Sequence, residues 1–266
     1  MNTQYLELSN LQVALAAAMI AVNAAISLWL KLGLERKLAW ASIRTVGQLL
    51  LIGLILKWIF AVRTLPLVLL LMVTMTGIAG VAAVSRAGRR YPGIYRDSII
   101  SAWSSSWLVA AVALTVVVSV HPWYEPQYAI PLLGMLLGNT MNGISIGIDH
   151  LPEDLLQHRN QIETALALGA TRHEAARDSV RNAIRSGMIP ILNSMMVVGI
   201  VSLPGMMTGQ LLAGIDPMQA VRYQIVIMFL IASTTALGTM GAVLLGFRRL
   251  FNADHQFLFH RITKRK

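Results

Sequence analysis

The sequence has no cysteine among its 266 residues, which excludes disulfides and thiolate metal sites. It is also poor in charge, because only 13% of the residues are Asp, Glu, Lys or Arg. Soluble domains have about 25% charged and roughly 45–50% apolar residues. Here the apolar share (AVILMFWYC) is 56% and the mean hydropathy is +0.62. The excess has to contact lipid, so we expect an integral membrane protein.

Several catalytic motifs are also missing. The sequence has no G-x-x-x-x-G-K-[ST] phosphate loop, no H-E-x-x-H and no G-x-S-x-G. No carboxylate lies in the middle of an apolar stretch, where coupled transporters and membrane proteases usually place one. We therefore expect a protein that is not an enzyme and binds no cofactor itself. Any uphill transport would take its energy from elsewhere.

Seven apolar stretches approach or exceed the roughly 20 residues that a helix needs to cross a bilayer. None alternates with a period of two, so helices are favoured over barrel strands. The sequence predicts an all-α polytopic bundle with about seven transmembrane helices, at 8–30, 41–60, 65–84, 98–120, 128–148, 188–210 and 222–247. We expect one domain over 1–266, with a long loop at 149–187 and a basic tail at 248–266.

The basic residues indicate the orientation of the chain. With the N-terminus outside and the C-terminus inside, 19 of the 22 Lys and Arg residues fall on the inner side. Only Lys57, Arg63 and Arg222 fall outside. The net charge of +10 therefore reports topology in a lipid bilayer, and we expect no nucleic-acid partner.

The loop 149–187 predicts two short helices joined by a tight corner. Asn160 and Glu163 have capping-box spacing, and so have Thr171 and Glu174. Gly169 stands where a left-handed residue would end the first helix. The second helix is expected to run toward Pro190 with a stripe of arginines at 177, 181 and 185. Such a helix is suited to transmit a conformational change from a soluble partner to the membrane helices.

The fifth and sixth stretches carry polar and small residues. Glycines at 134, 138, 143 and 147 favour tight helix contact, within or between subunits. Asn139 and Asn142 are either glue between helices or groups that line a pathway. Pro204-Gly205 should kink or break the sixth helix, as a gate or pathway wall or as a structural kink.

Fourteen methionines raise the question of a metal site. Six of them cluster in these two stretches, at 135, 141, 195, 196, 206 and 207. Thioethers suit soft ions such as Cu(I), but methionine also fills gaps in apolar cores, and we favour packing. Harder ligands stand at the span ends, where we expect them to be solvated: His121, Glu125, Asp149, His150 and Asp216. The sequence leaves a metal site unknown.

The segment Glu163-Thr-Ala165-Leu-Ala-Leu-Gly169 resembles the E-A-A-x-x-x-G loop of ATP-binding-cassette (ABC) transporter permeases. In that family the loop forms a coupling helix that docks on the ATPase subunit. The resemblance implies an ATPase-coupling role for Glu163, Ala165 and Gly169, with the second cap at Thr171 and Glu174. The family's downstream I-x-L-P spacing is absent, and an ordinary capped loop helix is the alternative.

Longer segments are similar to the Fet-type iron-export permease family, which includes plant permeases linked to aluminium tolerance. They are Pro131-Leu-Leu-Gly-Met-Leu-Leu-Gly-Asn-Thr-Met-Asn142, Asn193-Ser-Met195 and Val198-Gly-Ile-Val-Ser-Leu-Pro-Gly-Met-Met-Thr-Gly-Gln210. The resemblance implies a homodimer in the inner (cytoplasmic) membrane, with a separate ATPase chain using ATP. Iron or another metal would be exported. Residues expected to line or gate the path are Asn139, Asn142, Asn193, Met195, Pro204, Gly205, Met206, Met207 and Gln210.

Two other functions remain open at this point. One is a channel or secondary transporter that works without an ATPase, and the other is an ABC permease for a non-metal solute. The missing membrane carboxylates count against coupled transport and leave a passive channel open. A membrane-embedded enzyme has no catalytic constellation to support it.

Overall fold

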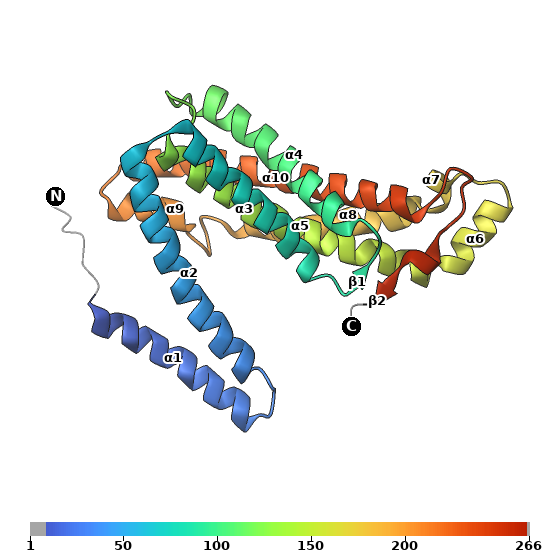
Figure 1. Cartoon of the computed structure of the whole chain (residues 1–266), viewed down its shortest axis with the longest axis horizontal. Coiled ribbons are helices and arrows are strands. Elements are labelled where there is room, and N and C mark those ends of the chain that lie inside the picture. The colour runs from blue at the N-terminus through green and yellow to red at the C-terminus, as the bar shows by residue number, and fades with distance from the viewer. Residues whose placement is uncertain (1–8, 265–266) are drawn as a thin grey trace.

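The computed structural model describes residues 9–264, most of which are helical (Figure 1). Within these described residues, six helices are long and apolar enough to cross a membrane, which confirms the expected all-α polytopic architecture. They are α1 (Asn10–Trp29), α2 (Glu35–Val62), α3 (Leu65–Ser85), α4 (Ile94–Val112) with its π-helical end η1 (Ala113–Val117), α5 (Pro126–Gln157) and α10 (Pro217–Leu250). Residue 8 of the first expected span and residues 265–266 of the tail lie outside the described residues.

The sixth expected span, 188–210, is not one helix. Its first part belongs to α8 (Arg177–Val197), a non-helical stretch follows at 198–204, and the chain resumes in α9 (Gly205–Leu212). The break expected at Pro204 is therefore present, but the helix ends seven residues earlier than that proline. Proline lacks an N–H, and Pro204 is the N-cap of α9, so it starts the second helix and does not end the first.

A central bundle holds α5, α8 and α10 in close contact, with α3 and α4 packed beside α5 and α10. A Cβ atom on Gly143 would collide with Thr239 of α10, and one on Gly187 would lie 2.7 Å from the Gly143 carbonyl oxygen. The absence of side chains lets the three backbones approach closely. Gly147 makes a similar contact with Val243, whereas a Cβ on Gly138 would meet nothing within 4 Å. A Cβ on Gly134 would lie 3.2 Å from the Met75 side chain of α3, so the expected glycine packing is present within the chain at three of the four positions.

The helices α1 and α2 form a hairpin that leans away from this bundle (Figure 1). Only 6% of the span window of each is buried inside the chain, against 56% for α5. A capping box on Ser9 and Gln12 starts α1. At the turn, Ser27 accepts the Leu34 N–H and donates to Glu35. The hairpin is therefore a well-formed pair of helices with its own turn and little contact with the remainder.

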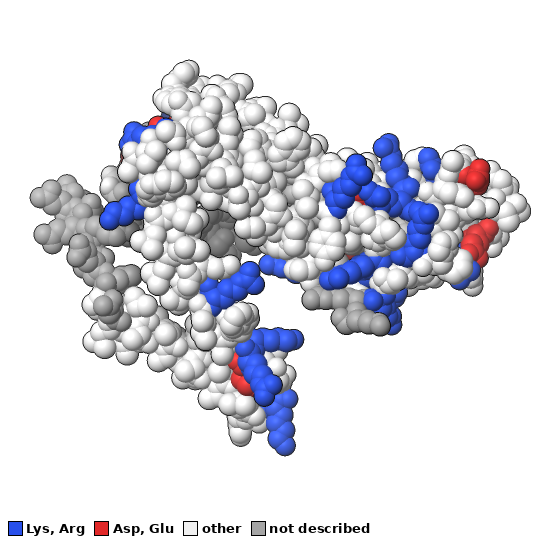
Figure 2. All heavy atoms as spheres, viewed as in Figure 1, with Lys and Arg blue, Asp and Glu red and all other residues white. Residues whose placement is uncertain are grey.

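Charged side chains gather at the ends of the helices, and the surface between them is almost free of charge in Figure 2. One blue group surrounds the strand pair β1 (Arg89–Arg90) and β2 (Thr263–Lys264), which joins the tail to the α3–α4 turn. Another lies at the α1–α2 turn. An uncharged band between charged ends is what a lipid bilayer requires of a spanning protein.

Candidate functional site: a methionine-lined chamber and an exposed corner

The break in the sixth span is a compact loop. The Gly199 N–H donates to the Ser202 carbonyl at 2.9 Å, and the Val201 N–H donates to the Val197 carbonyl at 3.0 Å. The Thr208 hydroxyl donates to the Pro204 carbonyl at 3.1 Å. The freed backbone is thus partly satisfied by the chain itself, as non-helical backbone at membrane depth must be.

Two adjoining cavities lie against this loop, with volumes of about 530 and 440 Å³. They share Val198, Gln224 and Met228, and we call them together the methionine chamber. Five methionines from four helices line it: Met135 of α5, Met195 of α8, Met206 and Met207 of α9, and Met228 of α10. Apart from Gln224, the polar lining consists of Asn139, Ser194 and Ser202.

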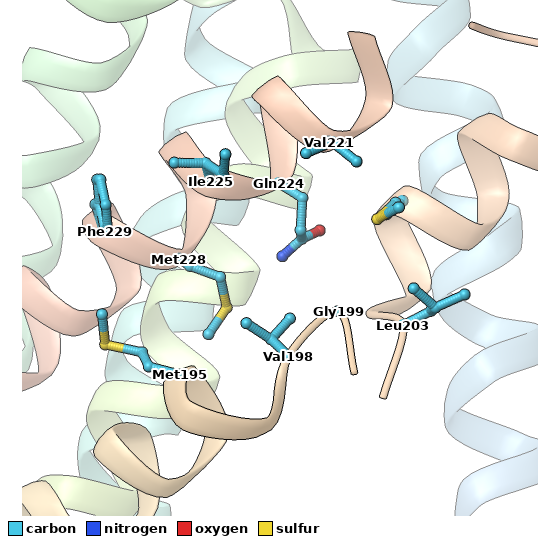
Figure 3. A pocket seen from close by; sticks show the side chains of 10 residues that line it. Met195, Val198, Gly199, Leu203, Val221, Gln224, Ile225, Met228 and Phe229 are labelled. Carbon is cyan, nitrogen blue, oxygen red and sulfur yellow. The ribbon is translucent and has the colours of Figure 1, made fainter. Parts of the chain in front are cut away.

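Gln224 is the principal polar group of the chamber. It is 6% exposed, and its Oε1 atom has no hydrogen-bond partner among the described residues. Figure 3 shows its amide group directed into the cavity, with the nitrogen on the side of Met228 and Val198 and the oxygen on the opposite side. An unpaired amide oxygen in a dry site costs about 1–3 kcal/mol. Such a group is typical of a site that takes a ligand or water.

The structure brings six of the nine expected pathway residues to the chamber wall. Asn139, Pro204, Gly205 and Met206 line one cavity, and Met195 and Met207 line the other. The remaining three do not line either cavity: Asn142 accepts a 2.7 Å hydrogen bond from Arg86, Asn193 is exposed on α8, and Gln210 has a buried, unpaired Oε1. Asn139 donates to the Met135 carbonyl at 2.9 Å. Sequence analysis did not select Gln224 as a site residue, because one glutamine in an apolar helix shows no spacing pattern.

Further cavities continue from the chamber toward the other end of the bundle. A cavity of about 330 Å³ shares Met135, Met206 and Ile227 with the chamber. It shares Tyr128 and Tyr223 with an outer cavity that reaches His121 and Glu125. The chamber is thus the inner member of a row of cavities that ends at a polar surface.

The expected corner of the long loop is present, although its helices differ from expectation. α5 continues to Gln157, so the stretch outside long helices is shorter than 149–187. α6 (Arg159–Ala167) ends in a Schellman motif in which the Ala170 N–H reaches the Ala165 carbonyl at 3.0 Å. Gly169 has φ +93°, as expected. Leu168 at the tip is 84% exposed.

The two capping boxes expected in this loop have different outcomes. The one on Asn160 is wrong. The N-cap of α6 is His158, two residues earlier, and it makes no side-chain cap; Glu163 instead accepts a 2.8 Å hydrogen bond from Arg159 Nε. The i, i+4 ion pair has replaced the cap. The box on Thr171 and Glu174 is confirmed at the start of α7 (Arg172–Ala175).

Two hydrogen bonds of the second capping box lower the pKa of the Glu174 carboxyl. The Thr171 hydroxyl and N–H donate to Glu174 Oε2 at 2.7 and 2.8 Å, and they hold the pKa of this carboxyl below its usual value. The helix then breaks at Ala176 before α8 begins, so the expected single helix toward Pro190 is divided into α7 and α8.

The tail also contacts this corner, which sequence analysis did not predict. We call residues 251–264 the C-terminal strap. Arg172 donates from Nη1 to the Asn252 carbonyl at 2.9 Å, and Arg159 lies 3.5 Å above the Phe259 ring within η2 (Phe259–Arg261). Phe251 stacks on Phe257 with centroids 5.2 Å apart. The strap joins α6 and α7 to β1 through the β2 pair.

Several charged groups expected to be solvated have partners. Asp149 accepts the Gly88 N–H at 2.7 Å, Asp216 caps α10, and Glu125 lies 3.7 Å from Arg63. No group of three or more His, Asp or Glu residues that would hold a metal ion occurs within residues 9–264. A hard-ligand metal centre is therefore not a feature of the described chain.

A family model matches residues 10–251, and its description reads Uncharacterised protein family (UPF0014). The chain belongs to the UPF0014 family. A UPF0014 membrane protein of Synechocystis is 43% identical over 239 residues, covering 89% of this chain and 92% of the relative. The Escherichia coli relative, named as a probable iron export permease protein FetB, is 34% identical over 259 residues, which cover 97% and 98%.

The family also has a plant member among the relatives found. ALUMINUM SENSITIVE 3 of Arabidopsis thaliana is 32% identical over 247 residues, covering 92% of this chain and 89% of the relative. No solved structure matches the chain significantly. The Synechocystis relative is named as a membrane protein and the Escherichia coli relative as a permease. The resemblance noted from the sequence is thereby confirmed.

Proposed function

We propose that this chain is a single-domain permease subunit of an ABC transporter, driven by a separate ATPase that docks on the α6–α7 corner. The observation that carries the proposal is the geometry of α8. One end of α8 follows the corner, and the other end reaches the methionine chamber at Met195 and Val198. Movement of the corner would therefore act directly on the chamber wall.

The corner itself has the properties of a docking element. Leu168, an apolar side chain beside charged residues, is 84% exposed at its tip, and Gly169 and the Thr171 cap make the turn rigid. Exposed apolar side chains with a polar rim are typical of protein contacts. Glu163, held by Arg159, and Ala165, whose carbonyl closes the Schellman motif, flank this tip.

The row of cavities supports a path through the chain. We place the substrate in the chamber and its exit at His121 and Glu125, with export out of the cytoplasm. Iron or another metal as the substrate is supported by the name of the Escherichia coli relative. The protein would act as a homodimer in the inner membrane, with ATP bound only by the partner ATPase.

Co-purification with the candidate ATPase in nanodiscs tests this function. Wild type should retain the ATPase, whereas Leu168→Asp and the double variant Glu163→Arg/Gly169→Arg should lose it. Glu35→Arg, a similar charge reversal at the α1–α2 turn, should retain it. A wild-type chain that binds no ATPase yet moves solute in liposomes would contradict the proposal and support an ATPase-independent channel.

A further inference from the structure

We propose that the methionine chamber binds a soft monovalent metal cation, Cu(I) or its analogue Ag(I), through thioether sulfurs and the amide oxygen of Gln224. This inference rests on the proposed permease function only in treating the bound ion as the transported substrate, and of the metals proposed there it selects a soft monovalent ion in place of iron. The binding itself is a property of the chain alone, and it is measured without the ATPase.

The first argument is the concentration of sulfur in one place. Five of the 14 methionines of the sequence line the two cavities, although they come from four separate helices. Methionine used only to fill gaps would be scattered through the core. Met72 of α3 has that ordinary role, because it is 1% exposed and packed within the core. The chamber methionines differ in bordering open volume as well, although all but Met207 also pack against the core.

The second argument is independent of sulfur. Gln224 points its amide into the same space and is 94% buried, since only 6% of it is exposed, and its Oε1 is unpaired. A lone electron pair directed at a cavity is suited to a cation. Met228 lies one turn further along α10 and borders the same two cavities (Figure 3). Sulfur and oxygen donors thus face one volume.

The third argument concerns the charge of the ion. No Asp, Glu or His lines either cavity, so every donor there is neutral. A divalent ion such as Fe(II) prefers imidazole and carboxylate ligands, and neutral donors in an apolar site would not offset the loss of its water. A soft monovalent ion has less hydration to lose and prefers thioethers. The donor set therefore does not suit ferrous iron at this position.

Substitution of methionine by leucine gives a sharp test. Leucine keeps the apolar volume and is usually well tolerated in place of methionine, but it removes the sulfur. A chamber that holds an apolar molecule would be little changed by it, whereas a soft-metal site would be lost. The variants are Met228→Leu alone, Met206→Leu/Met228→Leu and Gln224→Leu. The matched control is Met196→Leu, which removes a 69% exposed thioether beside Met195.

The measurement is equilibrium dialysis of the purified chain in nanodiscs against Ag(I), and separately against Fe(II), with bound metal counted by mass spectrometry. Wild type and Met196→Leu should bind Ag(I) alike and retain no Fe(II). The double variant should bind Ag(I) at least ~10-fold more weakly, since losing even an outer-shell partner costs 10–100-fold in metal affinity. Tryptophan fluorescence verifies that each variant is folded.

Two results would overturn the inference: no Ag(I) binding by wild type, or equal binding by wild type and the double variant. Either would leave ATPase co-purification unaffected, so the metal site and the permease function fail separately. Loss of ATPase binding with Ag(I) binding intact would overturn only the proposed function.

Discussion

The guanidinium Nε of Arg249 lies 2.6 Å from the Oδ2 atom of Asp97 and joins α10 to the start of α4. The two partners are unequally buried: the side chain of Asp97 is 2% exposed and that of Arg249 is 35% exposed. The pair lies beside Tyr91, whose pKa is raised above its usual value by burial and by Asp97. Loss of Arg249 would therefore leave a buried charge unpaired, whereas loss of the Asp97 charge would leave one that can reach water.

We expect Arg249→Met to destabilise the protein by about 3–5 kcal/mol, because it leaves a buried carboxylate unpaired. Asp97→Asn should cost less, since Arg249 can turn toward water. The double variant should recover part of the loss. Thermal unfolding followed by tryptophan fluorescence measures all three, and equal losses in the two single variants would contradict the asymmetry.

A second prediction concerns the glycine contacts of α5. Gly143→Ala should lower stability by about 1–3 kcal/mol, because its methyl group would collide with Thr239 of α10. Gly138→Ala should be neutral or stabilising by up to about 1 kcal/mol, since its methyl group would meet nothing within 4 Å. The unfolding midpoints of the two variants test this. A Gly138→Ala variant that folds well but loses its oligomeric state would show that this face contacts a second copy.

The Glu174 cap should respond to acid. Its pKa is lowered in the folded chain by the two hydrogen bonds from Thr171, so the stabilisation is fully present above the unfolded pKa of about 4.3. It is lost as the pH falls through the lower folded value. In protein labelled with ¹⁵N-threonine, the Thr171 amide shift should titrate with a midpoint below 4.3. A midpoint at or above 4.3 would show that the cap does not form in solution.

The C-terminal strap should hold the α6–α7 corner in place. Phe257→Ala removes a 7% exposed ring from the stack and should cost about 3 kcal/mol locally. Trypsin should then cleave faster at Arg159 and Arg172, both of which contact the strap. A chain that ends after Ile262 keeps the aromatic stack and serves as the control. Unchanged cleavage in Phe257→Ala would mean that the corner is stable without the strap.

The local features of the fold could be predicted from short-range patterns. Apolar length gave the long helices, and glycine and capping-box spacing gave the corner at Gly169 and the cap at Thr171. The box at Asn160 failed because Arg159 competes for Glu163 through an i, i+4 ion pair. The capping box and the ion pair both require the Glu163 side chain. Which of them forms depends on side-chain geometry, and residue spacing alone does not give that geometry.

The long-range features could not be predicted in this way. The Asp97–Arg249 pair is separated by 152 residues, and the Arg172–Asn252 contact by 80. Neither has a periodic signature. Gln224 is one amide in an apolar helix, and only the position of the loop 198–204 beside it reveals the cavity. The six chamber residues were expected from motifs local to the fifth and sixth stretches. The contribution of α10 to the same cavities was not expected, because it depends on how distant segments pack.

The interruption of the sixth span changes how force travels through it. α8 is about 30 Å long at 1.5 Å per residue, contains Pro190, which removes one backbone hydrogen bond, and ends in a non-helical loop. Under the proposed function we expect an axial shift imposed at Arg177 to be shared between a bend at Pro190 and residues 198–204, while α9 stays in place. Under that proposal the loop 198–204 would be the compliant joint of the molecule, and its stiffness would set how far movement of the corner deforms the chamber beside it.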